Sequence, residues 1–180
     1  MTDDYTALDI EHDPEQRLLS GVTAHGNIEF EVPYMTQVSM YPNLYVGGCT
    51  TGLILPSFID HVISLYPWEE YDRCAMTYRS HAEFVMYDDV DFDPDDFIRI
   101  AAYALDKIES GPTLIHCQAG LNRSCFVAAM CLIMKGFDPD EVVGNLRKDR
   151  GQAVLCNPAF EDYVLNRTAD LLNIAPDSPS

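Results

Sequence analysis

The chain has 180 residues, of which 47% are hydrophobic and 22% charged, and its formal net charge at pH 7 is −18. Such a charge argues against a nucleic-acid backbone or an anionic membrane surface as the main partner. No apolar run reaches the roughly 18 residues that a membrane span requires. The acidic N-terminus lacks the basic and apolar parts of a secretory signal, so we expect a cytoplasmic protein.

Residues 1–32 are the least globular part of the sequence. They contain eight of the 29 acidic residues, and Arg17 is their one basic residue. We expect an acidic N-terminal arm that is flexible or loosely packed, with a short helix around 14–19. The folded domain is then expected at 33–174, and 175–180, which include two prolines, form a frayed tail.

Short apolar segments typical of buried strands alternate with helical patterns along the domain. The predicted strands are 44–47, 61–65, 83–87 and 113–116. The predicted helices lie around 97–108, with one apolar face, at 125–134, which is apolar all round, at 138–150, and after Asn157-Pro158. This alternation indicates an α/β fold.

The most informative segment is 113–124, Thr-Leu-Ile-His-Cys-Gln-Ala-Gly-Leu-Asn-Arg-Ser. A loop between a strand and a helix directs consecutive backbone N–H groups and the positive end of the helix dipole at one point, which suits a tetrahedral oxyanion. Gly120 supplies backbone freedom, and Arg123 can clamp two phosphate oxygens. The expected phosphate-binding residues are Gln118, Ala119, Gly120, Leu121, Asn122 and Arg123.

Cys117 lies at the start of this loop. Cysteines at helix N-termini can have pKa values roughly 1 to 5 units below that of a free thiol, so we expect Cys117 to be a thiolate at neutral pH. Ser124 can hydrogen-bond the sulfur and ease its departure from a phosphocysteine. A buried structural cysteine is the simpler reading, but it does not need the polar and charged residues that follow Cys117.

These residues resemble a known family. His-Cys-x-x-Gly-x-x-Arg-Ser is the signature of cysteine-dependent protein tyrosine phosphatases, most closely the dual-specificity branch, and its fixed positions are His116, Cys117, Gly120, Arg123 and Ser124. The resemblance implies that 33–174 form a catalytic domain with a central, mainly parallel sheet of about five strands flanked by helices. It also implies that His116 braces the loop rather than acting as a base.

The family's general acid is an aspartate on a loop before the cysteine, and this chain has several candidates between 88 and 96. Asp93, before Pro94, looks like a helix N-cap, and Asp95 and Asp96 fit the first turn of that helix. The family places the acid about nine residues before a helix aromatic, and Asp88 stands nine before Phe97. Asp88 is therefore favoured, Asp89 is the alternative and Asp91 comes third.

The predicted reaction is hydrolysis of phosphotyrosine, and of phosphoserine or phosphothreonine, in a phosphoprotein or phosphopeptide. Neighbouring carboxylates are expected to keep the acid protonated. No cofactor or metal is expected, because the histidines and cysteines show no paired ligand spacing. We expect a monomer. The alternatives are a phosphoinositide or RNA 5′-phosphate phosphatase, another cysteine-loop enzyme such as a sulfurtransferase or arsenate reductase, and a non-enzymatic phosphopeptide-binding module.

Overall fold

A five-stranded sheet forms the centre of the molecule. The computed structural model describes residues 10–13, 17–50, 52–68, 71 and 78–168. The strands of the large sheet follow the order β4-β5-β8-β6-β7. Their bounds are Met35–Gln37 (β4), Leu44–Gly48 (β5), His61–Ser64 (β6), Ser80–Glu83 (β7) and Thr113–Cys117 (β8).

All strand pairs of this sheet are parallel except the edge pair of β4 with β5. β8 is the central strand and all five of its residues are buried, because it is paired on both sides and packed against helix α2. Strands buried on both faces read as continuous apolar runs, which is why Leu114 and Ile115 were recognisable in the sequence. The expected fold class, a mainly parallel five-stranded sheet flanked by helices, is confirmed.

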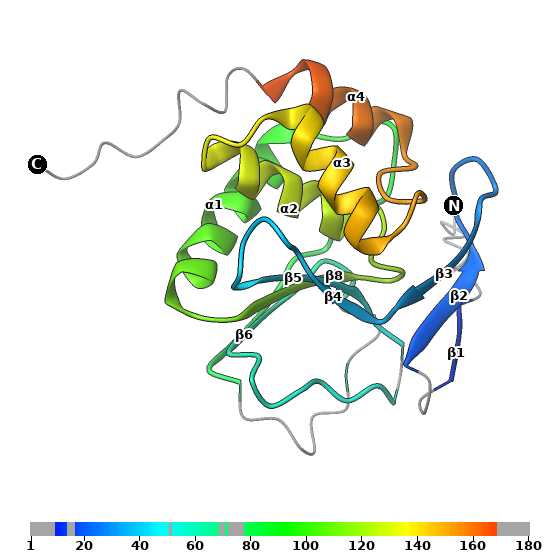
Figure 1. Ribbon diagram of the computed structural model, residues 1–180, viewed down its shortest axis with the longest axis vertical. Helices are drawn as coiled ribbons and strands as arrows, with labels where there is room; N and C mark the ends of the chain where they lie inside the picture. Colours follow the sequence, from blue (N-terminus) through cyan, green and yellow to red (C-terminus); the bar gives the residue numbers. More distant parts are fainter. Residues whose placement is uncertain (1–9, 14–16, 51, 69–70, 72–77, 169–180) are drawn as a thin grey trace, which may run out of the picture.

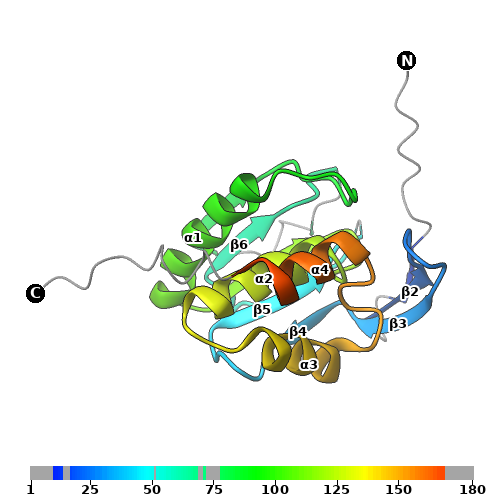
Figure 2. The same cartoon turned by 90° about the horizontal axis from the view of Figure 1, so that it is seen from above.

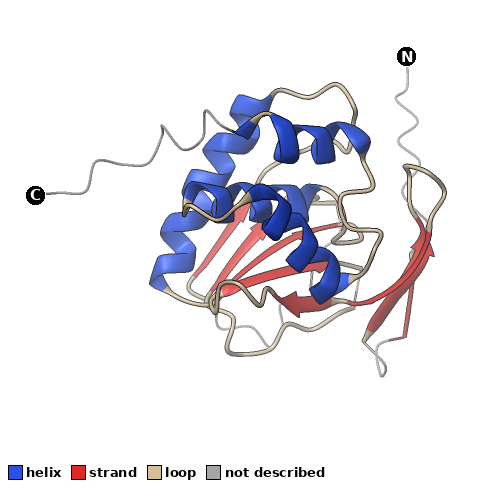
Figure 3. Cartoon of the chain, turned by 45° about the horizontal axis from the view of Figure 1, so that its top comes forward, coloured by secondary structure: helices blue, strands red, loops and turns tan. Residues whose placement is uncertain are grey.

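Four helices gather over one face of the sheet, as Figures 1 and 3 show. Their bounds are Pro94–Ser110 (α1), Arg123–Met134 (α2), Pro139–Arg150 (α3) and Pro158–Asn166 (α4). In α1, α3 and α4 an Asp or Asn side chain caps the first turn and proline occupies the first position. Helix α2 lies in the middle of this layer, and eleven of its residues are buried, so its composition is apolar all round.

A second sheet of three antiparallel strands lies at one end of the molecule, beside the β4 edge (Figure 2). It consists of Glu11–Asp13 (β1), Leu18–Val22 (β2) and Glu29–Pro33 (β3). Leu19 of β2 is fully buried and belongs to the same hydrophobic core as the residues of the large sheet. This part of residues 1–32 therefore differs from the loosely packed arm that we expected, because Leu19 of β2 and the alternate residues Phe30 and Val32 of β3 are buried.

The predicted helix around 14–19 is wrong where the structure describes it, because Leu18 and Leu19 are in β2, while 14–16 lie outside the described residues. The strand expected at 83–87 ends at Glu83 and begins at Ser80. The predicted tail at 175–180 lies outside the described residues. In the part of the chain that the structure describes, no helix is both long enough and apolar enough to cross a membrane.

Candidate active site

Cys117 is the last residue of the central strand and is 2% exposed. Its register partner in the parallel strand β5 is Gly48, and the preceding residue, His116, is opposite Ser64 of β6. The strand therefore delivers Cys117 to the carboxyl end of a parallel sheet, between two neighbours that fix its position. This edge is where open α/β sheets generally bind ligands.

The loop 118–122, which we call the Cys117 loop, turns its carbonyl oxygens outward. The amide of Cys49 donates to the carbonyls of Cys117 and Gln118 at 3.1 and 3.0 Å. The amide of Leu155 donates to the Leu121 carbonyl at 2.9 Å. Since the C=O and N–H of one trans peptide unit point in opposite directions, these contacts turn the intervening N–H groups toward the inside of the loop.

Arg150, the last residue of α3, donates hydrogen bonds to two further carbonyls of the Cys117 loop. It is 3% exposed, and its guanidinium donates to the carbonyls of Gly120 at 2.5 Å and Ala119 at 3.0 Å. Gly120 has a φ of +76°, and a Cβ at this position would collide with the backbone of Gly47. The family signature's glycine is thus required both by its backbone conformation and by the close approach of β5.

The sulfur of Cys117 has two polar contacts inside the loop. The amide of Gly120 donates to Sγ at 3.3 Å, and the Ser124 hydroxyl lies 3.5 Å from it. Ser124 is the second residue of α2, so the sulfur also faces the positive end of a helix whose dipole favours anions. These three features all stabilise negative charge on the sulfur.

Arg123 begins α2 and is 6% exposed. One of its terminal nitrogens donates to the Met86 carbonyl at 3.0 Å, and its guanidinium lies 5.0 Å from the centre of the Tyr66 ring. Its Nε is buried and has no hydrogen-bond partner among the described residues. A buried guanidinium N–H without an acceptor is costly, and an anion in the adjacent pocket would supply that acceptor.

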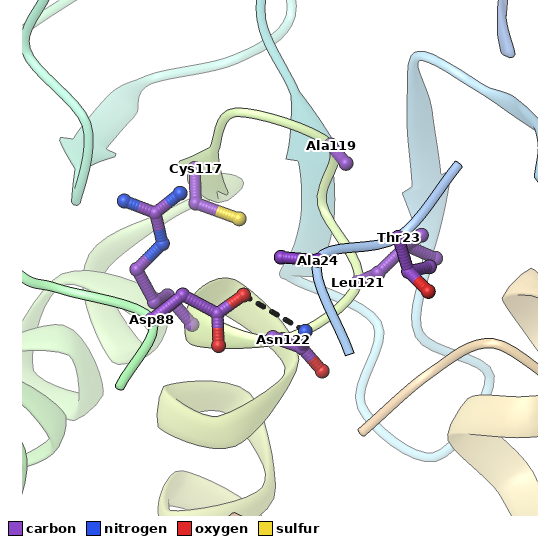
Figure 4. A pocket seen from close by; sticks show the side chains of 8 residues that line it. Thr23, Ala24, Asp88, Cys117, Ala119, Leu121 and Asn122 are labelled. Carbon is purple, nitrogen blue, oxygen red and sulfur yellow. Dashed lines mark hydrogen bonds between the residues drawn. The ribbon is translucent and has the colours of Figure 1, made fainter. Parts of the chain in front are cut away.

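Asp88 lies at the same pocket, as Figure 4 shows, whereas Asp89 does not line it. Oδ2 of Asp88 accepts a hydrogen bond from Asn122 of the Cys117 loop at 2.8 Å, and Oδ1 of Asp88 accepts one from Asn157 at 2.9 Å. Asp89 instead uses its carboxylate locally, accepting from the backbone amide of Val90 at 2.6 Å. The geometry therefore brings Asp88, and not Asp89, close to Cys117.

The hydrogen-bond partners of the Asp88 side chain are N–H groups, not the neighbouring carboxylates. The other acidic residues of the stretch are used elsewhere: Asp93 caps α1 as predicted, and Asp95 and Asp96 lie in its first turn.

His116 is buried behind the loop. Burial lowers its pKa from 6.5 to about 4, so the ring is neutral at physiological pH, and its Nδ1 lies 3.3 Å from the Cys117 carbonyl oxygen. The Tyr71 ring meets the imidazole edge-on at 5.0 Å between centres, and the Tyr71 hydroxyl donates to the Gly48 carbonyl at 2.5 Å. His116 is therefore a buried residue that packs at the end of the central strand, behind the Cys117 loop.

Sequence reasoning missed several residues of the site. Thr23 and Ala24, from the turn after β2, form one wall of the pocket, and His25 contacts Asp88. In the sequence, Asn157 marks only the start of the last predicted helix, and Arg150 only the end of the helix predicted at 138–150. No local pattern distinguishes these roles, because each residue meets the loop from a distant part of the chain.

The pocket is lined by Thr23, Ala24, Asp88, Cys117, Ala119, Leu121, Asn122 and Arg123. The nucleophile candidate, the guanidinium and one carboxylate thus share a single small cavity. Across the described ranges, no group of three or more His, Cys, Asp or Glu side chains is placed to hold a metal ion.

Comparisons with known proteins give a consistent result. Residues 77–163 match the protein-tyrosine phosphatase family. No curated protein matches the chain. Among solved structures, a mouse putative dual specificity phosphatase complexed with zinc tungstate is 18% identical and superposes with a TM-score of 0.61, over 77% of this chain and 90% of that one.

Human DUSP28 is 14% identical, with a TM-score of 0.59, over 73% of this chain and 90% of its own. A human tyrosine phosphatase-like serine/threonine/tyrosine-interacting protein is also 14% identical, with a TM-score of 0.56, over 72% of this chain and 92% of its own. At these identities the structures show a shared fold, and the family match spans the strand, the loop and the helices that build the site. Residues 77–163, just under half of the chain, thus match the protein-tyrosine phosphatase family, and the chain has the fold of the dual-specificity phosphatases, which together support a cysteine-dependent phosphatase.

Proposed function

We propose that this phosphatase hydrolyses phosphotyrosine, and also phosphoserine or phosphothreonine, through a phosphocysteine intermediate on Cys117. One observation carries the proposal. The Cys117 sulfur shares a pocket with the side chain of Arg123, whose buried Nε has no acceptor among the described residues. The carbonyls of loop residues 118–121 accept hydrogen bonds from groups that do not line this pocket. Such a pocket has a nucleophile and a set of donors for the equatorial oxygens of a phosphoryl group.

In the first step the Cys117 thiolate attacks phosphorus and the bond to the leaving oxygen breaks. Asp88 gives its proton to that oxygen, so the alcohol or phenol departs neutral. The amides of the Cys117 loop and the Arg123 guanidinium bind the three non-bridging oxygens. The position of Asp88 in the pocket supports this role over Asp89.

In the second step water attacks the phosphocysteine. Asp88, now a carboxylate, accepts a proton from the water, and sulfur leaves as a thiolate. The Ser124 hydroxyl, 3.5 Å from the sulfur, donates to it as negative charge returns. The Gly120 amide, at 3.3 Å, contributes in the same way.

The substrate assigned here is a phosphoprotein or phosphopeptide. Four side chains of the Cys117 loop, Gln118, Ala119, Leu121 and Asn122, are uncharged, so the loop carries no added cations to match a polyphosphorylated head group. The net charge of −18 opposes a nucleic-acid substrate. We further propose a cytoplasmic monomer, because the five described cysteines are all free, which suits a reducing compartment.

The first test concerns the nucleophile. We expect wild-type protein to turn over para-nitrophenyl phosphate, and Cys117→Ser to lose that activity while binding inorganic phosphate with unchanged affinity in calorimetry. Cys131→Ser is the matched control, because Cys131 is buried about two turns further along α2 than Ser124, against the Ala101 carbonyl of α1, and does not line the pocket; it should keep the wild-type rate. Binding without turnover by the wild type would indicate a phosphopeptide-binding module instead.

The second test concerns the acid. We expect Asp88→Asn to lower kcat for phenyl phosphate, a poor leaving group, by about 100-fold, because general acid catalysis contributes roughly 10² to 10⁴. The loss for para-nitrophenyl phosphate should be much smaller, since its phenolate leaves without a proton. Asp89→Asn is the control and should keep both rates. If the leaving-group dependence appeared in Asp89→Asn instead, the general acid would be Asp89 and not Asp88.

A further inference from the structure

The turn between β2 and β3 is held in shape by hydrogen bonds to the Thr23 side chain. The Thr23 side chain is buried; its hydroxyl donates to the His25 carbonyl at 2.7 Å and accepts from the Ile28 amide at 3.0 Å. Gly26 and Asn27 have φ values of +76° and +49°, which are typical of a tight reversal between strands. The backbone position of His25 is thereby fixed from both sides of the turn.

The hairpin that carries this turn is attached to the Cys117 loop. Leu19 of β2 is fully buried, and its side chain fills the space beside Gly48 that a Cβ would occupy. The Pro33 carbonyl, at the end of β3, accepts a hydrogen bond from Arg150 at 2.8 Å. Arg150 also binds the Ala119 and Gly120 carbonyls, so the hairpin and the loop share one anchoring side chain.

From this turn, His25 reaches the proposed general acid. Its Nε2 lies 3.1 Å from Oδ1 of Asp88 and 3.1 Å from the Asp88 backbone oxygen. The two side chains are only 18% and 16% exposed, so the contact is largely shielded from water. A single Nε2–H can serve both oxygens, which fixes the side chain relative to its own backbone.

The contact with His25 decides which oxygen of the Asp88 carboxyl can carry a proton. Each carboxyl oxygen has two lone-pair sites in the plane of the group. Those of Oδ1 are taken by His25 and Asn157, whereas Oδ2 accepts, among the residues that the structure describes, only from Asn122. The one site left for a proton is therefore on Oδ2, the oxygen that faces the Cys117 loop.

We propose that His25 is a positioning residue for catalysis: together with Asn157 it occupies Oδ1 of Asp88, so that the transferable proton resides on Oδ2, beside the bound phosphate ester. The N-terminal hairpin is then part of the active site. In the reaction the proton passes from Oδ2 to the leaving oxygen, and His25 keeps its own proton throughout. The inference depends on the proposed role of Asp88.

The test uses the full chain and two aryl phosphates. We expect His25→Ala to lower kcat for phenyl phosphate by about tenfold, and kcat for para-nitrophenyl phosphate by less than about twofold, because the loss should be a fraction of the total acid contribution. His25→Gln, whose amide nitrogen can reach the position of Nε2, should recover most of the phenyl phosphate rate. In an Asp88→Asn background, adding His25→Ala should change neither rate.

Val22→Ala is the matched control, because Val22 lies in the same hairpin, is 45% exposed and does not line the pocket. It should retain both rates, and all variants should retain the wild-type circular dichroism spectrum. Equal losses for both esters in His25→Ala, or the same loss in the Asp88→Asn background, would overturn the role of His25. No leaving-group dependence in Asp88→Asn itself would overturn the proposed acid.

Discussion

His116 shows how one buried side chain links the site to the stability of the domain. Its pKa is about 4 in the folded protein, because burial disfavours the charged ring, against 6.5 for an ordinary histidine. Between these two values the unfolded chain binds a proton that the folded protein does not. The free energy of unfolding must therefore fall as the pH is lowered through this window.

We expect His116 to account for about 3 kcal/mol of lost stability between pH 7 and pH 4. Urea unfolding across this range should show a steeper decline for wild type than for His116→Asn, whose amide can still donate to the Cys117 carbonyl. Identical declines would mean that the folded protein tolerates a protonated ring at this position.

Asp88 and Asp89 are neighbours in the chain, but their carboxylates have different hydrogen-bond partners. Both follow the same strand region, and their sequence surroundings are equally acidic. Only the side chain of Asp88 accepts hydrogen bonds from Asn122, Asn157 and His25, which come from three different parts of the chain, whereas Asn157 meets Asp89 only at its backbone carbonyl. The resemblance favoured Asp88 by its spacing, but the contacts that hold it were not predictable.

At the scale of elements, helix α3 does more than cover the sheet. Its last residue, Arg150, donates to two carbonyls of the Cys117 loop and also to Thr36 Oγ1 at 2.9 Å in β4. Burial lowers the pKa of Arg150 below its ordinary value. The helix thus holds the loop in the shape that turns its amides inward.

We expect Arg150→Met to lower the free energy of unfolding by about 3–5 kcal/mol, because it leaves several buried carbonyls without donors. It should also lower kcat/KM for aryl phosphates, since a relaxed loop no longer directs its amides at one point. Lys148→Met, an exposed change in the same helix, is the control and should alter neither quantity. Wild-type stability in Arg150→Met would show that water replaces these bonds at no cost.

At the scale of the whole molecule, the active site depends on segments that are far apart in the sequence. The turn 23–28, the strand end at Cys117 and the start of α4 at Asn157 meet around one carboxylate. The acidic surface, with a net charge of −18, means that the positive potential of this pocket is local. We therefore expect a phosphate ester to be bound by the few donors of the loop rather than by the field of the molecule.

The sequence alone determined the four helices, strands β5, β6 and β8, and the position of the Cys117 loop between β8 and α2. Helices α1, α3 and α4 begin at caps that local hydrogen bonds dictate, and the central strand and α2 are apolar because they are buried on all sides. These features depend on residues close together in the chain, so periodicity and motif spacing suffice to find them.

The tertiary structure alone decided which distant residues complete the site. An acidic segment near the N-terminus looks solvated when its sequence is considered alone, yet Leu19 is buried in the core and His25 binds Asp88. Likewise, Arg150 is ordinary at a helix end until the fold places it beneath Ala119 and Gly120. Burial and hydrogen bonding between distant segments arise from packing, and packing has no period in the sequence.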